Sequence, residues 1–293
     1  MARGLLLIFA ILIFGELSAQ INHPKASPFA SISQDVGLTN IHVEYSRPAV
    51  RGRKIFGELV PYGRIWRVGA NESTKITLSS NVMVNDSVLE KGTYALYAFP
   101  EANNWEVVFH KNITHWGDGR DNYNSAEDVL RVQVKPNSSK EFQENFLISF
   151  DSIDHNSLQM IWHWAHTQIR IPIQVDTHSF MQGQIESELK ANPSAQTYYE
   201  AARYYQEQGI RYKEALEYLD KAIEIGGDTY YFNRVKSLVE AAMEDYGSAI
   251  SSAQKSLELA NLQGKDEFVR MNEKNIAKWK ARLIKDQPNS KNQ

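Results

Sequence analysis

The sequence predicts an α+β protein of two domains, in which an all-β sandwich or distorted barrel precedes a short α-helical repeat. Three observations support this prediction. Apolar and polar residues alternate from Thr39 to Val175, the spacing of apolar residues becomes helical after Val175, and a helical pattern then recurs after 34 residues. With 293 residues, the chain is long enough for two domains that each bury a core of their own.

The β domain is expected over residues 20–176. Successive side chains of a strand point to opposite faces, so an apolar–polar alternation indicates a strand with one buried face. About nine short runs of this kind, separated by turn residues, are typical of a sandwich or barrel. The clearest runs are Ile41–Tyr45, Tyr94–Ala98, Trp105–Phe109, Phe146–Phe150, Leu158–Trp164 and Ile169–Val175. Pro172 has no amide hydrogen, which places the last run at a sheet edge or the proline at a bulge.

A linker helix is expected over residues 177–195, followed by a repeat over residues 196–286 that resembles tetratricopeptide (TPR) helices. Tyr212–Leu216 and Tyr246–Ile250 lie 34 positions apart in the same register, which is the period of a TPR helix pair. Both segments carry a small alanine that allows two helices to approach closely. A further helix near residues 266–283 is expected to cap the repeat.

The N-terminus predicts export. Residues 1–19 have the anatomy of a secretory signal peptide, because Arg3 precedes an apolar run over residues 5–14 and small residues precede Gln20. An apolar run of ten residues is shorter than the roughly 20 that span a bilayer. The mature protein is therefore expected to be soluble, periplasmic or secreted, without a membrane span and with a disordered tail at residues 287–293.

Composition excludes several classes of function. The chain has no cysteine, which excludes disulfides, thiol catalysis and thiolate metal sites. Its net charge of −3 argues against a protein that coats nucleic acid. No nucleophile-elbow motif and no phosphate-binding glycine loop is present, so neither motif assigns a reaction.

The segment Tyr45–Thr74 is the strongest candidate for a binding site. It breaks the alternation of the strands and is rich in glycine and proline, which is typical of a long loop on a rigid sheet. Only two acids, Glu58 and Glu72, accompany its six cations, which are Arg47, Arg51, Arg53, Lys54, Arg64 and Arg67. Arginine offers a planar fork of donors that suits carboxylate, phosphate or sulfate. The sequence therefore predicts a small anionic, glycan or peptide ligand.

The candidate ligand-binding residues combine these arginines with aromatic and polar neighbours. Tyr62 and Trp66 are expected to offer a flat apolar wall to a sugar or ring. The full set is Arg47, Arg51, Arg53, Tyr62, Trp66, Arg67, Asn71, Glu72, Trp116, Tyr123 and Arg131. The helical repeat is expected to contact a protein partner, since repeats of this class commonly bind peptides or neighbouring domains.

Two other interpretations stay open. A hydrolase or isomerase of the cell envelope would use Glu72 or Asp128 as a base beside the loop arginines. A purely structural scaffold would pair the arginines internally. No cofactor is predicted. No metal site is predicted either, because His163 and His166 are three apart on a strand and point to opposite faces, and nothing in the sequence shows that His110 and His115 approach them across the sheet. The acids near residue 118 do not match a calcium-binding EF-hand loop.

Long motifs in the β domain resemble a known family. They are SRP at Ser46–Pro48, GRKIFG at Gly52–Gly57, LVPYG at Leu59–Gly63, WRVGANEST at Trp66–Thr74, KGTYALYAFP at Lys91–Pro100 and DVLRV at Asp128–Val132. In order and spacing they resemble a secreted bacterial family known only as a domain of unknown function (DUF 2911). The resemblance implies a compact β domain, export, and TPR-like helices from Gln196 onward. It implies no activity, so no catalytic role follows from it.

Overall fold

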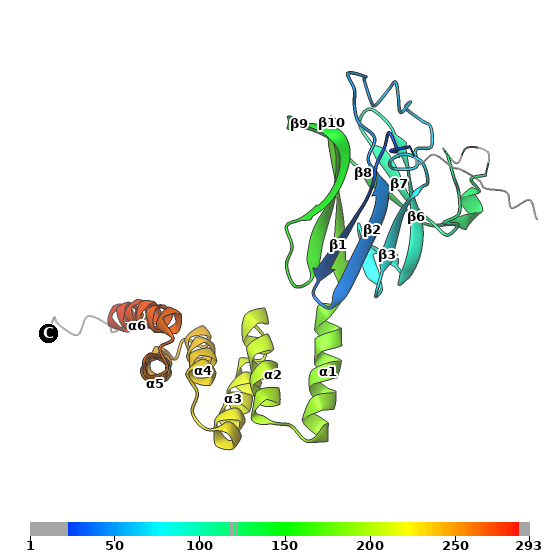
Figure 1. The fold of residues 1–293 in the computed structure, drawn as a ribbon. Helices are drawn as coiled ribbons and strands as arrows, with labels where there is room; N and C mark the ends of the chain where they lie inside the picture. Colours follow the sequence, from blue (N-terminus) through cyan, green and yellow to red (C-terminus); the bar gives the residue numbers. More distant parts are fainter. Residues whose placement is uncertain (1–22, 118–119, 121, 287–293) are drawn as a thin grey trace, which may run out of the picture. The chain divides into compact units, whose positions relative to one another are not determined.

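The structure is a computed structural model that describes residues 23–117, 120 and 122–286 (Figure 1). It divides between Thr177 and His178 into a β unit and a helical unit, which confirms the predicted α+β layout of two domains. The predicted signal peptide at residues 1–19 and the predicted tail at residues 287–293 lie outside the described residues. Within the described part of the chain, no helix is long and apolar enough to cross a membrane.

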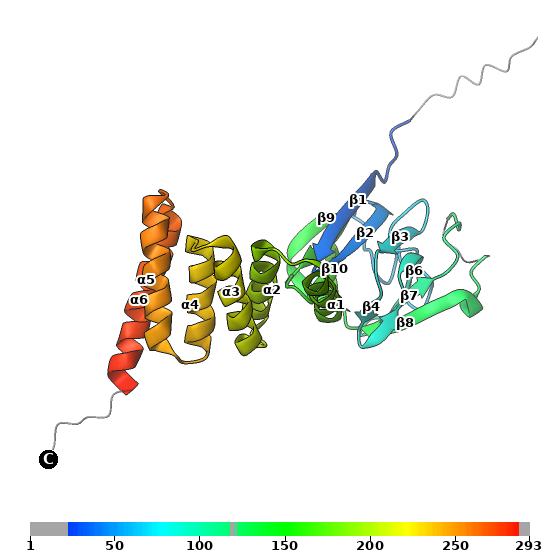
Figure 2. The ribbon, with the colours of Figure 1, turned by 90° about the horizontal axis from the view of Figure 1, so that it is seen from below.

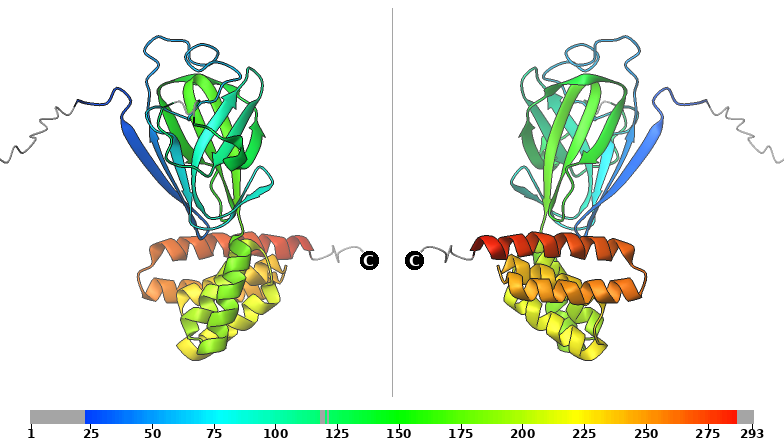
Figure 3. Two further views of the ribbon diagram at one scale, coloured as in Figure 1. Left: turned by 90° about the vertical axis from the view of Figure 1, so that its right-hand side faces the viewer. Right: turned by 90° about the vertical axis from the view of Figure 1, so that its left-hand side faces the viewer.

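The β unit is a sandwich of two open antiparallel sheets, which is one of the two architectures that the alternation predicted. The first has the strand order β1-β2-β3-β6-β7-β8, with β1 at Phe29–Val36, β2 at Thr39–Ser46, β3 at Thr74–Leu78, β6 at Gly92–Pro100, β7 at Trp105–His110 and β8 at Asp128–Val134. The second has the order β5-β4-β10-β9, with β4 at Val82–Val84, β5 at Ser87–Leu89, β9 at Asn137–Asp151 and β10 at Ser157–Val175. The right-hand view of Figure 3 shows the second sheet in front of the first.

Strand β10 corrects one element of the prediction. The sequence showed two separate runs, Leu158–Trp164 and Ile169–Val175, but the structure forms one strand over both. The pairing with β9 shifts register on either side of Ala165, whose φ is +51°. Such a bulge changes which residues face inward, so the apolar side chains move from even to odd positions along a continuous strand.

The prediction for Pro172 is wrong: β10 is an inner strand of its sheet, between β4 and β9, and its bulge lies at Ala165 rather than at Pro172. The proline is tolerated because it lies between the two paired stretches of the strand. The pairing of β10 with β9 ends at Gln168, and its pairing with β4 begins at Ile173. Asn85 donates its backbone N–H to the Pro172 carbonyl at 3.3 Å, so the proline acts as an acceptor in the ladder. Strand β1 was not predicted, because its residues Phe29, Ser31 and Ser33 are exposed and give only a weak alternation.

The core between the sheets is unusually aromatic. Trp66 stacks on Trp164 with ring centroids 6.1 Å apart and an interplanar angle of 18°. Trp105, Phe146 and Phe56 surround this pair, mostly edge to face. Edge-to-face pairs are favourable because the positive ring edge meets the negative ring face. The indole of Trp66 belongs to the long loop between β2 and β3, so that loop contributes directly to the core.

Among the described residues, the helical unit contains a first helix, two helix pairs and a final helix. Its helices are α1 at Thr177–Ala191, α2 at Ala195–Gln208, α3 at Tyr212–Gly226, α4 at Tyr230–Ala242, α5 at Tyr246–Leu262 and α6 at Asp266–Asp286. The start of α5 at Tyr246 follows that of α3 at Tyr212 by 34 positions, as the repeat predicted. Ala215 and Ala249 are fully buried at equivalent positions. Successive helices from α2 to α6 contact one another (Figure 2).

Polar groups are buried inside the repeat and are largely bonded to one another. Asn272 of α6 donates to the Ser256 hydroxyl at 2.8 Å and accepts from Arg234 at 3.2 Å. Ser256 in turn donates to the Tyr230 carbonyl at 2.6 Å. This network joins α4, α5 and α6 and sets their register, because a buried polar group without a partner is costly.

The carboxyl group of Glu240 on α4 is buried with too few hydrogen bonds to replace those it would make with water. Its side chain is buried, and no hydrogen-bond partner of its Oε2 is found in the described residues. Burial raises the pKa of Glu240 above its ordinary value of 4.5, and Ser252 and Lys236 offset this only in part. The native state therefore holds this proton at pH values where the unfolded chain has released it.

The substitution Gly37→Ala should destabilise the β unit more than Gly52→Ala. Both glycines have positive φ, +54° and +69°, so both substitutions cost about 1 kcal/mol of left-handed strain. A Cβ at Gly37 would also lie 2.5 Å from the His155 carbonyl oxygen, whereas a Cβ at Gly52 meets open space. We expect Gly37→Ala to cost about 1–3 kcal/mol more by urea unfolding. Equal losses would contradict the described turn.

The substitution Glu240→Gln should stabilise the helical unit at neutral and alkaline pH. Because the folded-state pKa is raised, the native state binds more protons than the unfolded state, and stability falls as pH rises from about 4.5 through the folded-state pKa. We expect the variant to melt higher than the wild type at about pH 8, with the gap closing towards about pH 4. Far-ultraviolet circular dichroism measures both melting temperatures, and Glu258→Gln on the exposed face of α5 serves as the control.

Candidate functional site

The long segment between β2 and β3, residues 47–73, is called the basic loop here, and its backbone is hydrogen-bonded to both sheets. Its first part pairs with β9, since Val50 donates its backbone N–H to the Glu144 carbonyl and Phe146 donates to the Pro48 carbonyl. Its second part pairs with β6, where Trp66 and Ala98 exchange two backbone hydrogen bonds of 2.8 Å. Together with the buried Trp66 ring, these bonds hold a long irregular segment in one conformation.

Two adjoining cavities open beside this loop. The larger has a volume of about 310 Å³ and the smaller about 240 Å³, and they share Leu59, Val60, Trp66 and Arg67 as lining residues. The further arginines are Arg51 and Arg53 in the larger cavity and Arg64 and Arg120 in the smaller. Among the described residues that line either cavity, none is acidic. The arrangement concentrates positive charge around an apolar floor.

Three loop arginines are held by backbone carbonyl groups. Arg47 Nε donates to the Phe146 carbonyl at 3.0 Å, and Arg51 donates to the Ala26 carbonyl at 3.3 Å. Arg53 donates to the carbonyls of Val50 and Ala49, at 3.0 and 2.6 Å. A carbonyl orients a guanidinium without neutralising its charge, and each guanidinium has five N–H donors. The positive charge of these side chains is therefore positioned rather than cancelled.

Of the aromatic residues predicted for this site, Trp66 is buried, whereas Tyr62 and Trp116 are exposed. Trp66 is only 6% exposed, so its ring is part of the core and forms a cavity floor instead of a free wall for a sugar. Tyr62 is exposed and lies over Gly57, where a Cβ would come within 2.9 Å of the phenol ring. Trp116 is 71% exposed, and its backbone forms a bridge with that of Glu72.

Asn71 and Glu72 do not line the arginine cavities but a separate hollow of about 150 Å³. The Asn71 amide donates to the Ser27 carbonyl and the Ser46 hydroxyl, so it fixes the loop. Glu72 is exposed and forms an ion pair with Lys75 at 2.7 Å, which holds the pKa of the Glu72 carboxyl below its ordinary value. A lowered pKa makes Glu72 a weaker base, so its surroundings give no support to a catalytic role.

Tyr123 and Arg131 belong to a second cluster, on the outer face of the six-stranded sheet. Arg131 forms ion pairs with Asp128 and Glu106, and its guanidinium lies 5.4 Å from the centre of the Phe99 ring. Tyr123 donates its hydroxyl to Asp128 Oδ2 at 2.6 Å. Burial, and then the bond to Asp128, raise the pKa of the Tyr123 phenol. Asp128 therefore bonds to both Arg131 and Tyr123.

Two histidines complete this outer-face cluster. His110 Nδ1 contacts the other oxygen of Asp128 at 2.8 Å, and His115 Nδ1 contacts the Tyr97 hydroxyl at 2.9 Å. Both histidines are buried. Sequence reasoning assigned neither to a site, and the only signal was their place in a polar, aromatic stretch between two predicted strands. The bulge and loop that bring them together leave no regular spacing in the sequence.

Comparison with protein families identifies the β unit. The family described as "Protein of unknown function (DUF2911)" matches residues 27–173, from just before β1 to near the end of β10. The chain belongs to the DUF2911 family. No curated protein and no solved structure matches the chain. The family description states no activity, and the DUF2911 match ends before α1.

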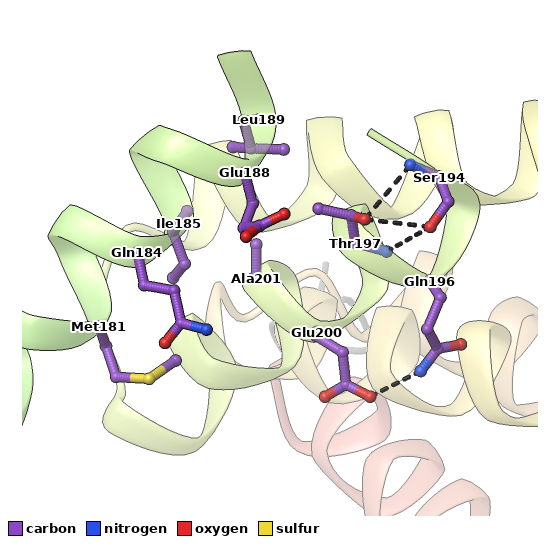
Figure 4. Close-up of a pocket in the computed structure, with 10 residues that line it drawn as sticks. All are labelled: Met181, Gln184, Ile185, Glu188, Leu189, Ser194, Gln196, Thr197, Glu200 and Ala201. Carbon is purple, nitrogen blue, oxygen red and sulfur yellow. Dashed lines mark hydrogen bonds between the residues drawn. The ribbon is translucent and has the colours of Figure 1, made fainter. Parts of the chain in front are cut away.

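A further hollow lies outside the DUF2911 domain, between α1 and α2 of the helical unit (Figure 4). Its volume is about 260 Å³. Met181, Ile185 and Leu189 of α1 give it an apolar side, and Glu188 and Glu200 add negative charge. Figure 4 also shows Gln196 donating to Glu200 and the capping contacts of Ser194 with Thr197 at the start of α2. None of these residues was predicted as a site residue.

The substitution Asp128→Asn in the DUF2911 domain should lower the pKa of Tyr123. It removes the carboxylate charge that opposes ionisation of the phenol, while burial continues to oppose it. Nuclear magnetic resonance of chains labelled at the tyrosine ring carbons can follow Tyr123 during an alkaline titration. Glu106→Gln is the matched control, because Glu106 binds the opposite side of Arg131. An unchanged Tyr123 titration in Asp128→Asn would contradict the described hydrogen bond.

Proposed function

We propose that the DUF2911 domain of this chain is a binding module for a small ligand with phosphate, sulfate or carboxylate groups, including acidic glycans and peptides. The observation that carries the proposal is the lining of the two adjoining cavities, where five arginines meet and no described lining residue is acidic. Arginine binds such groups in pairs of parallel hydrogen bonds.

Preorganisation supports the same proposal. Arg51 and Arg53 are already bonded to backbone carbonyls, so less side-chain entropy is lost when a ligand orders them further. Trp66 and Val60 supply an apolar floor, which excludes water and strengthens charge-assisted bonds above it. The cavity volume of about 310 Å³ suits one sugar acid or a phosphorylated side chain.

The proposed location of the module and its proposed protein partner are inferred from the sequence alone. Export through a signal peptide at residues 1–19 would place the module in the periplasm or outside the cell. Contact of the helical unit with a protein partner follows from the repeat class alone. The enzyme and scaffold interpretations remain hypotheses; of the two proposed bases, Glu72 is exposed with a lowered pKa and Asp128 is bonded to Arg131, Tyr123 and His110.

The double substitution Arg51→Gln/Arg53→Gln should weaken anion binding. A lost charge-assisted hydrogen bond costs about 1.5–3 kcal/mol, so each arginine that grips the ligand contributes about tenfold or more in affinity. The probes are sodium phosphate, sodium sulfate, oligogalacturonate and a phosphoserine peptide, measured by isothermal titration calorimetry and by the shift of melting temperature. We expect at least one probe to bind the wild type and to lose affinity in the variant.

Lys54→Gln is the matched control. Lys54 is a neighbouring exposed cation that pairs with Glu58 and does not line either cavity, so its removal changes net charge without changing the site. Arg64→Gln then separates the two cavities, since Arg64 lines only the smaller one. If none of the probes binds, or if Lys54→Gln weakens binding as much as the double variant, the proposal fails.

A further inference from the structure

One cluster of side chains, on the outer face of the six-stranded sheet, has the composition of a transition-metal site. His110, His115 and Glu127 each offer one ligand atom, and these atoms lie within 4.8 Å of one another. His110 is completely buried, His115 is 8% exposed and the Glu127 side chain is 39% exposed. None of these three residues lines either arginine cavity.

Local backbone irregularities bring the three residues together. His110 ends β7, and the pairing of β7 with β8 skips Val129, so that His110 lies opposite Asp128. Glu127 ends a short 3-10 helix, Ser125–Glu127, that leads directly into β8. A bulge of this kind re-aims a side chain at a sheet edge, and bulges are frequent beside functional sites.

Each histidine is oriented by a partner on its Nδ1 atom. Asp128 Oδ1 lies 2.8 Å from Nδ1 of His110, and the Tyr97 hydroxyl lies 2.9 Å from Nδ1 of His115. A carboxylate bonded to one ring nitrogen fixes the proton there and leaves the lone pair on Nε2. This is the arrangement by which proteins orient histidine ligands of metal ions. Nε2 of His110 is left to face the cluster.

Nε2 of His110 lies where a positive charge would be stabilised by the Glu127 carboxylate. Nε2 of His110 is buried without a hydrogen-bond partner among the described residues, and it lies 3.5 Å from Glu127 Oε2. In the tautomer with its proton on Nδ1, two electron-rich atoms face each other there, and either a proton on Nε2 or a metal ion between the two atoms makes the contact favourable. Metal–ligand bonds of about 2.1 Å at a tetrahedral angle separate two ligand atoms by about 3.4 Å. The observed separation fits this geometry.

We propose that His110, His115 and Glu127 bind one first-row divalent transition-metal ion, with zinc the best match. Two imidazoles and one carboxylate suit zinc, whereas magnesium and calcium prefer oxygen ligands throughout. Three protein ligands leave a fourth position, which the partial exposure of Glu127 opens to solvent. That composition is typical of catalytic rather than structural zinc sites, because a structural site usually has four protein ligands.

The sequence predicted no metal site, and the spacing of the ligands explains why. That prediction considered His163 and His166, which are indeed separate: His163 is buried, while His166 is exposed and contacts the Ser139 carbonyl through Nδ1 at 3.1 Å. The three residues of the cluster are spaced by five and twelve positions across a loop, 110 to 115 to 127. No regular helix or strand spacing produces that pattern, so only the fold brings them together.

The test uses the full mature chain without an affinity tag, treated with a chelator and dialysed. Titration with zinc chloride by calorimetry should show one ion bound per chain, and cobalt(II) should give the visible absorption of a tetrahedral site. His115→Gln and Glu127→Gln should each weaken zinc binding about tenfold or more. Circular dichroism checks that the variants fold; Glu127 is partly exposed, so Glu127→Gln remains informative if a histidine variant does not fold.

His166→Gln is the matched control, because it removes an exposed histidine of the same unit that lies outside the cluster. It should leave zinc affinity and stoichiometry unchanged. Zinc binding weaker than about 100 μM in the wild type would overturn the proposal. Undiminished binding in the His115→Gln/Glu127→Gln double variant would also overturn it, since the ion would then lie elsewhere.

Discussion

The stacking of Trp66 on Trp164 is the contact on which the β unit's candidate site depends. Trp66 comes from an irregular loop, yet it occupies the centre of the aromatic core between the sheets. Removing its ring from water anchors the middle of the loop, and the backbone pairing with Ala98 fixes the direction of the chain there. Arg64 and Arg67 are consequently held beside the cavities, because Trp66, which lies between them in the chain, cannot turn outward.

Strand β6 connects the basic loop with the histidine cluster. Leu96 and Ala98 point into the sandwich, towards the aromatic core that holds the basic loop. Tyr97 points to the opposite face, where it contacts His115 and belongs to a smaller apolar cluster. The alternation of a single strand therefore supports an arginine-lined site through one face and a histidine-rich site through the other. Disturbing β6 would affect both.

The sequence was sufficient where regular periodicity carries the information. The alternation of strands such as β2 and β7 predicted a sandwich, and the offset between Tyr212 and Tyr246 predicted the helix pairs. Where periodicity changes inside one element, as at Ala165 in β10, the alternation indicated two strands instead of one. The strand propensities of single residues do not indicate a register shift, because the shift depends on the partner strand.

The candidate site shows the same division. Composition alone located the basic loop, and the structure places Arg51, Arg53 and Arg67 around cavities. Composition did not reveal that Trp66 is buried, since an aromatic ring in a loop suits a core and a binding surface equally well. Asn71 and Glu72 follow closely in sequence, but the turn after Val68, whose φ is +55°, carries them to another hollow.

The choice of carbonyl groups as partners for the loop arginines has a consequence for the environments in which the domain can work. A guanidinium and a peptide carbonyl both keep their charge state from mildly acidic to mildly alkaline solution. The carbonyl groups that orient Arg47 and Arg53 therefore do not change their charge in this pH range. If the cavities bind an anion as proposed, mild acidification should therefore act on the charge of the ligand and not on the bonds that orient these two arginines.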